Sequence, residues 1–145
     1  MSKFLVTGGL GLIGHNVVRR LRDREHETVI MDIRTNYGII PQAELDYLMA
    51  ERLRKIDNHE VYNTDICLGG IVDFVVEKER PNVIIHCASF PRQKVVSQNP
   101  IWGSDVMSTG LVNLLELTAE YKIPKFVYIF VLIYKAVVTI TTPSK

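Results

Sequence analysis

Residues 5–20 read LVTGGLGLIGHNVVRR and place four glycines within seven positions, between an apolar run and a helix-like run. Glycine weakens regular structure, so this much backbone freedom needs a reason. The N-terminus of a helix presents unpaired N–H groups and a partial positive charge, which bind a phosphate when no side chain blocks its approach. The stretch fits both G-x-G-x-x-G, over residues 9–14, and a close T-G-x-x-G-x-x-G variant, over residues 7–14. It therefore predicts a pyrophosphate site, the alternative being a turn that only tightens the first βα connection.

Strand-like and helix-like stretches alternate along the whole chain. Short β-rich runs and stretches with helical spacing of apolar residues follow one another, which is typical of a parallel sheet with helices on both faces. We expect strands over residues 3–7, 27–32, 60–66, 83–89 and 125–134. We expect helices over residues 13–25, 41–56, 71–80 and 104–121. The sequence thus predicts the α/β class, and its 145 residues suit one domain.

Composition excludes several classes of protein. The chain is 47% hydrophobic and 23% charged, which is typical of a globular protein. A net charge of +1 gives no general attraction to nucleic acid or to an acidic membrane surface. The two cysteines, Cys67 and Cys87, fit neither a disulfide framework nor a zinc site. With no secretory leader at the N-terminus, we expect a cytoplasmic protein that binds no metal.

An acidic residue stands at the end of the second expected strand. Asp32 lies eighteen residues after Gly14, where a carboxylate can accept hydrogen bonds from an adenosine ribose. The same charge would repel a 2′-phosphate, so the position favours NAD over NADP. Arg34 leaves that choice open, because a guanidinium could pair with such a phosphate. The alternative for Asp32 is a strand-end turn former.

Six blocks of sequence together carry a family resemblance. They are TGGLGLIG (7–14), VIMDIRTN (29–36), TDI (64–66), VIIHCAS (83–89), NP (99–100) and TGLVNLLE (109–116). In this order and spacing the chain resembles the N-terminal half of the extended short-chain dehydrogenase/reductases, and most of all the nucleotide-sugar epimerases and dehydratases. The resemblance implies a doubly wound Rossmann fold of strand order 3-2-1-4-5, truncated after the fifth strand. It also implies a dinucleotide-binding domain over residues 1–131, with NAD across the C-terminal strand edges.

The resemblance also implies which residues contact the cofactor. It places Gly8, Gly11, Leu12, Ile13 and Gly14 at the pyrophosphate, Asp32 and Asn36 at the adenosine ribose, Asp65 and Ile66 beside the adenine, Ala88 and Ser89 next to the cofactor, and Lys94 near the phosphates and nicotinamide ribose. Other interpretations stay open for three of the charged or polar positions. Asp65 could cap the next helix, Lys94 could be a solvated loop charge, and His86 is expected to be a packed core residue rather than a ligand or base.

The chain departs from the family where catalysis is expected. Members carry a Ser or Thr after the fifth strand, where this sequence has Phe130-Val131-Leu132. The family's Tyr-x-x-x-Lys pair should follow later, where the chain has already ended. Tyr121 and Lys125 have that spacing, but Pro124 interrupts the helix that would hold them on one face. Met107 stands where the family has an Asn. We therefore predict no catalytic residue in this chain and treat 121–125 as a decoy.

The last residues, 132–145, resemble no part of the family. Residues 137–142 are β-prone, and we expect them to add a strand or a dimer contact, since an exposed edge would aggregate. A membrane anchor is not expected, because Lys135 interrupts a short apolar run. We expect the substrate domain of the family to be absent from this chain, as it would be in the product of a truncated or frame-shifted gene. Three functions are compatible with this sequence: an incomplete NAD-binding module, an enzyme whose partner chain completes it and its nucleotide-sugar site, or a structural or regulatory protein.

Overall fold

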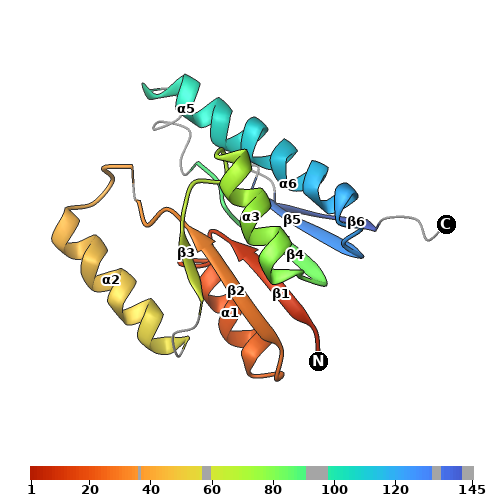
Figure 1. The fold of residues 1–145 in the computed structure, drawn as a ribbon. Helices are drawn as coiled ribbons and strands as arrows, with labels where there is room; N and C mark the ends of the chain where they lie inside the picture. The colour runs from red at the N-terminus through yellow and green to blue at the C-terminus, as the bar shows by residue number, and fades with distance from the viewer. Residues whose placement is uncertain (36, 57–59, 91–97, 132–134, 142–145) are drawn as a thin grey trace.

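A six-stranded sheet forms the centre of the molecule. The computed structural model describes residues 1–35, 37–56, 60–90, 98–131 and 135–141. Its strands are β1 (Lys3–Thr7), β2 (Glu27–Asp32), β3 (Val61–Asn63), β4 (Val83–His86), β5 (Lys125–Val131) and β6 (Lys135–Thr141), in the order β3-β2-β1-β4-β5-β6 (Figure 1). The first five are parallel. This confirms the predicted Rossmann-type order 3-2-1-4-5.

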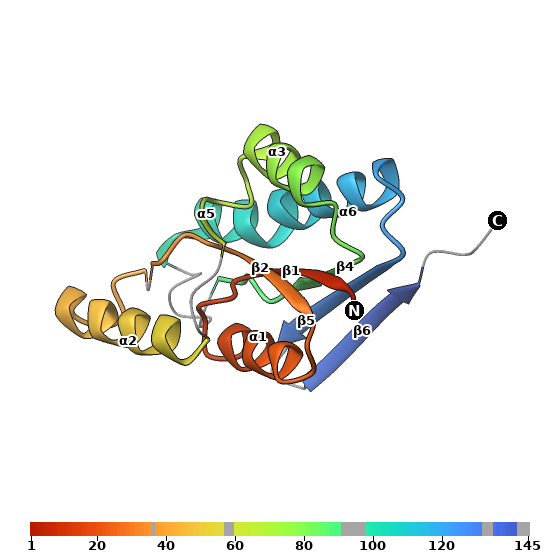
Figure 2. The same ribbon diagram turned by 60° about the horizontal axis from the view of Figure 1, so that its bottom comes forward.

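Helices cover both faces of this sheet. They are α1 (Gly14–Arg22), α2 (Gln42–Lys55), α3 (Gly69–Glu79), α5 (Pro100–Ser104), the π-helical turn η1 (Asp105–Thr109) and α6 (Gly110–Glu120). Figure 2 shows α1 and α2 on one side of the strands, with α3, α5 and α6 on the other. Parallel strands need such crossover connections, and the helices bury the strands on both faces.

Each face of the sheet has its own hydrophobic core. Because successive strand residues point to opposite faces, Leu5 and Val6 of β1 belong to different cores. The Leu5 core packs against α3 and α6 and includes Val75 and Leu114, which are fully buried. The Val6 core packs against α1 through Val18. The continuous apolar runs of the central strands therefore reflect burial on both sides.

The boundaries of several elements differ from those expected. β3 ends at Asn63 and β4 at His86, short of the expected residues 66 and 89. The expected helix over residues 104–121 begins earlier, at Pro100, because proline suits the first turn of a helix, and η1 then continues it into α6. The third helix likewise begins at Gly69, ahead of the expected residue 71. Thr64 and Cys87, which directly follow β3 and β4, each still donate one backbone hydrogen bond to the neighbouring strand.

The chain beyond β5 turns back along the sheet. β6 pairs with β5 in antiparallel register, from Lys125 opposite Thr141 to Val131 opposite Lys135. The expected extra strand is therefore present, and it makes the sheet mixed rather than wholly parallel. The division into a domain over 1–131 and a separate tail stays a prediction.

Parallel strands bring their ends together at one edge of the sheet. β1, β2 and β4 end at Thr7, Asp32 and His86, and these residues lie in neighbouring strands. The loops that follow them therefore converge, as they do at the ligand-binding edge of open α/β sheets. Within the described ranges, no helix combines the length and the apolar character needed to cross a membrane.

Candidate functional site

The glycine-rich loop passes very close to the end of β4. Gly8 has a φ of +66°, and a Cβ atom there would lie 2.6 Å from the backbone nitrogen of Ala88. A Cβ on Gly14 would collide with the carbonyl oxygen of Gly8. Only glycine fits either position. The loop thus turns tightly and brings the start of α1 against β1, as its glycine spacing predicts.

The N-terminus of α1 is open to a ligand. The helix begins at Gly14, and its N-cap residue, Ile13, makes no side-chain capping bond. The first amides of a helix have no partner within it, so they are available to an anion. Leu12 is 72% exposed and Ile13 is 44% exposed, which leaves the backbone beside them accessible from solvent.

Asp32 fixes the position of the loop. One carboxylate oxygen accepts a hydrogen bond from the Leu10 amide at 2.9 Å, and the other accepts from the Arg34 amide at 2.7 Å. Arg52 of α2 donates from Nη1 to the Leu10 carbonyl at 2.6 Å. The second strand, the glycine loop and α2 are thereby tied together. Arg52 was not predicted as a site residue, because no local spacing connects it with Leu10.

The turn after β3 holds the second acidic residue. Asp65 accepts a hydrogen bond at Oδ1 from the Cys67 amide at 2.9 Å. The N-cap of α3 is Leu68, without a side-chain capping bond, so Asp65 does not cap that helix. Asn113 of α6 donates to the Ile66 carbonyl at 2.9 Å, and a Cβ on Gly110 would collide with the Ile66 side chain. Helix α6 therefore positions the Asp65–Ile66 turn.

One buried hydroxyl beside this turn lacks a partner. Thr64 directly precedes Asp65, and its Oγ1 has no hydrogen-bond partner within the described part of the chain. Its amide donates to the Asp32 carbonyl at 3.3 Å, which joins the ends of β2 and β3. Buried polar groups are normally satisfied by protein, water or ligand. The acids at the ends of two neighbouring strands therefore lie beside an unsatisfied polar group.

His86 is part of the core, as the sequence predicts. It is 1% exposed, and its Nδ1 lies 2.6 Å from the hydroxyl of Thr7. Burial lowers the pKa of His86 to about 4, so the ring is neutral near pH 7. The Ala88 amide donates to the same hydroxyl at 3.4 Å. This network fixes β1 against the loop that follows β4.

The remaining predicted contact residues divide into two groups. Ala88 is half-buried next to Gly8, and Ser89 is exposed on the same loop. Asn36 and Lys94 lie outside the described residues. Every other predicted position is brought to the carboxyl edge of the sheet, on the loops after β1, β2, β3 and β4.

Three aromatic side chains meet at this edge and were not predicted as site residues. The ring centroid of Tyr37 lies 4.1 Å from that of Phe90 and 4.8 Å from that of Trp102. Phe90 and Trp102 lie 5.5 Å apart. Their positions in the sequence have no periodicity that could have indicated the contact. Only the convergence of three separate segments brings them together.

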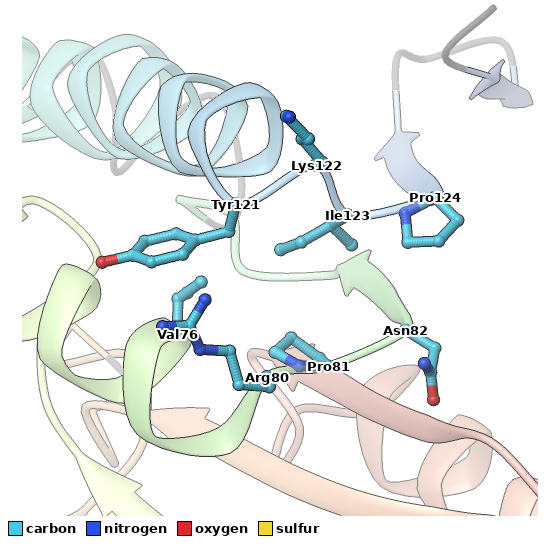
Figure 3. Close-up of a pocket in the computed structure, with 8 residues that line it drawn as sticks. All are labelled: Val76, Arg80, Pro81, Asn82, Tyr121, Lys122, Ile123 and Pro124. Carbon is cyan, nitrogen blue, oxygen red and sulfur yellow. The ribbon is translucent and has the colours of Figure 1, made fainter. Parts of the chain in front are cut away.

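The opposite, amino edge of the sheet carries a different surface. A pocket of about 200 Å³ there is lined by Val76, Arg80, Pro81, Asn82, Tyr121, Lys122, Ile123 and Pro124 (Figure 3). Tyr121 donates a hydrogen bond to Asp73 at 2.6 Å, which raises the pKa of Tyr121 to about 12. A tyrosine base needs the reverse shift.

Helix α6 ends at Glu120, and Lys125 begins β5, so the two members of the Y-x-x-x-K spacing share no helix. The interpretation of residues 121–125 as a decoy stays a prediction. Phe130 and Val131 lie within β5, where the family has its Ser or Thr just beyond the strand. No cluster of three potential metal ligands occurs in the described ranges.

Comparison with known proteins gives this arrangement a family. The model of the NAD dependent epimerase/dehydratase family matches residues 4–130. The chain belongs to this family. A putative UDP-glucose 4-epimerase of Methanocaldococcus jannaschii is 28% identical over 86% of this chain and 36% of its own length. A dTDP-glucose 4,6-dehydratase of Haemophilus influenzae is 27% identical over 83% and 34%.

A solved structure supports the same relationship. UDP-glucose 4-epimerase of Thermus thermophilus, in complex with NAD, is 25% identical and superimposes with a TM-score of 0.67 over 86% of this chain and 36% of that protein. The chain therefore spans about a third of the length of the relatives it matches. The family match ends within β5, so the comparisons concern the N-terminal part of those proteins.

Proposed function

We propose that this chain binds NAD at the carboxyl edge of its sheet, as the NAD-binding domain of a nucleotide-sugar epimerase or dehydratase. The observation that carries the proposal is the close approach of Gly8 to the Ala88 backbone, next to Gly14, where α1 begins without a side-chain cap. This geometry suits a diphosphate held by main-chain amides. The NAD bound in the structure of the Thermus thermophilus relative supports the choice of cofactor.

The residues present fit the separate parts of a dinucleotide. Gly8, Gly11 and the amides at residues 12–14 would hold the pyrophosphate. Asp32 and Asn36 would hold the adenosine ribose, with Asp65 and Ile66 at the adenine. Ala88, Ser89 and Lys94 would lie toward the nicotinamide side. Bound NAD would supply a hydride acceptor.

The environment of Asp32 favours NAD over NADP. Its carboxylate lies at the end of β2 and is held by two backbone amides, so it is fixed where a 2′-phosphate would meet its charge. Arg34 has a φ of +53°, and its own amide donates to Asp32. The side chain of Arg34 is exposed. We infer that Asp32 decides the cofactor choice, and Arg34 does not reverse it.

We further propose that the chain alone is catalytically incomplete. A proton must leave a sugar hydroxyl as hydride moves to NAD, and no residue in the described ranges is placed as the base at this edge. Tyr121, which has the right spacing, lies at the opposite edge of the sheet. A partner chain that supplies the missing half, including a nucleotide-sugar site, is the second candidate. A structural or regulatory protein, self-associating through residues 132–145 in the cytoplasm, is the third.

Calorimetry tests the proposal directly. We expect micromolar binding of NAD and ADP-ribose and weaker binding of NADP. Asp32→Ala should weaken NAD about tenfold to a hundredfold, since it removes hydrogen bonds to a charged acceptor. It should also narrow the preference for NAD over NADP. Asp46→Ala, which removes an exposed carboxylate from α2, is the matched control and should leave the affinity unchanged.

Turnover separates the first candidate from the second. The chain alone should epimerise or dehydrate no UDP- or dTDP-sugar. Turnover by the purified chain would contradict catalytic incompleteness while leaving NAD binding intact. The absence of heat on titration of NAD would reject the first two candidates together.

A further inference from the structure

An aromatic cluster of Tyr37, Phe90 and Trp102 stands at the carboxyl edge of the sheet. Tyr37 follows the strand-end loop of β2, Phe90 follows β4, and Trp102 lies in α5. The Tyr37 ring is tilted by 45° to Phe90 and stands edge-on to Trp102 at 68°. Phe90 is 4% exposed and belongs to the core below, whereas Trp102 is 41% exposed. The cluster therefore has a fixed base and a side that faces solvent.

The same cluster adjoins both acids of the candidate site. Burial raises the pKa of the Tyr37 hydroxyl to about 12, and the negative charges of Asp65 and Asp32 add to that shift. Tyr37 is thus within electrostatic reach of the two carboxylates. Its φ of +56° is rare for a non-glycine residue, and it is followed by Gly38 at +74°. Packing against Phe90 and Trp102 accompanies this unusual backbone.

These neighbours define the chemistry that the surface could recognise. Flat aromatic faces bind a planar, polarisable ring. Two carboxylates repel anions and accept hydrogen bonds from N–H and O–H donors. An aminopurine attached to a ribose offers a planar ring, an exocyclic amine and two hydroxyls. An aliphatic chain offers the carboxylates no donor, and an anionic group would be repelled by them.

We infer that Tyr37 and Trp102, supported from below by the buried Phe90, form the wall against which the adenine ring of a bound dinucleotide stacks, with Tyr37 as its main contact. The inference rests on the proposed NAD binding and adds residues that the glycine motif and the acids do not indicate. It assigns base recognition to aromatic contact combined with Asp65.

Binding should be visible in the emission of Trp102, the chain's single tryptophan. Titration with ADP-ribose should change this emission in the unmodified protein, whereas inorganic pyrophosphate should not. Tyr37→Ala should weaken ADP-ribose about tenfold, which equals 1.4 kcal/mol of stacking lost. Tyr37→Phe keeps the ring and should bind within about twofold of the unmodified protein. Tyr47→Ala, on exposed α2, is the matched control and should bind unchanged.

The outcomes of these measurements distinguish a failure of the aromatic wall from a failure of the proposed NAD binding. If the unmodified protein binds neither NAD nor ADP-ribose, the proposed function fails. If it binds both while Trp102 emission stays constant and Tyr37→Ala keeps full affinity, NAD binding stands and the aromatic wall is wrong. Tighter binding by Tyr37→Ala would also overturn the inference, because Tyr37 would then obstruct the site. The emission change in the unmodified protein tests the wall even if a variant fails to fold.

Discussion

The two edges of the sheet differ in what they present to solvent: accessible backbone in the glycine loop at the carboxyl edge and paired side chains at the amino edge. At the carboxyl edge, Gly8 and Gly14 let the backbone approach without side chains, and α1 begins uncapped. At the amino edge, side chains pair with one another beside the pocket of Figure 3: buried Glu79 accepts hydrogen bonds from Lys3 and Tyr62. The contrast shows that the carboxyl edge is open to a ligand because glycines leave its backbone uncovered. The amino edge is stabilised by hydrogen bonds between its side chains.

At the amino edge, the C-terminus of α3 is capped by a hydrogen bond within the protein. Arg80 closes α3 in a left-handed conformation, with its amide bonded to the Val76 carbonyl. Its guanidinium lies 4.7 Å from the centre of the Tyr121 ring, and Figure 3 shows it beneath that ring. Lys3 bridges Glu79 and Glu27 at 2.9 and 2.7 Å. These contacts account for the surface structurally, without a ligand.

Substitution of Gly8 should have the largest effect on both stability and NAD affinity. In Gly8→Ala the new Cβ would collide with the Ala88 backbone at a φ that disfavours side chains. We expect a loss of about 2 to 3 kcal/mol in the free energy of unfolding and more than about a hundredfold loss of NAD affinity, because the loop must move. Urea denaturation and calorimetry measure the two effects.

Gly70→Ala is the matched control. Gly70 lies in the first turn of α3, and a Cβ there would meet nothing within 4 Å. Alanine in a helix should leave the affinity unchanged and raise stability by up to about 1 kcal/mol. Equal behaviour of the two variants would show that the close approach at Gly8 has no role in binding.

Acid should destabilise the two edges in different pH ranges. At the carboxyl edge, the pKa of His86 is about 4 in the folded chain against an ordinary 6.5. Between these values the unfolded chain binds a proton that the folded chain does not. Stability should therefore fall as pH falls from 6.5 to 4, by up to about 1.4 kcal/mol per pH unit.

At the amino edge, burial alone would raise the pKa of Glu79, but hydrogen bonds from Tyr62 and Lys3 outweigh it and hold the pKa at about 2. A lowered carboxyl pKa stabilises the fold above its ordinary value of 4.5, and this contribution is lost as pH falls from 4.5 to 2. Urea titrations at successive pH values measure the free energy of unfolding. In His86→Asn this free energy should no longer fall between pH 6.5 and 4, and in Glu79→Gln it should no longer fall between pH 4.5 and 2. A variant that abolished both ranges would show that the edges titrate as one unit.

Tyr121→Phe should give the smallest effect. It removes the hydroxyl that Asp73 accepts from and leaves the ring over Arg80. NAD affinity should stay within about twofold of the unmodified protein, because the residue lies at the far edge of the sheet. A large loss of affinity, or of any turnover found with a partner chain, would show that the Y-x-x-x-K spacing has a catalytic role after all.

The accuracy of the sequence-based predictions differs between segments. The first two strands follow the expected residues, 3–7 and 27–32, because each contains a short apolar run that is buried on both faces of the sheet. The start of α5 at Pro100 and the π turn η1 were missed, since their register depends on packing against the sheet. β6 was expected as a strand, but its antiparallel direction follows from the pairing partner.

The order of the strands was expected from the family resemblance. The sequence by itself determined the βα unit with its glycines, the acid that ends β2 and the acid that follows β3. These are local features, in which spacing and residue type dictate turn geometry and burial. Tertiary structure alone decided that Arg52 holds the glycine loop and that Tyr37 meets Phe90 and Trp102. Such contacts join segments far apart in the chain, and no local periodicity encodes which surfaces the folded sheet brings together.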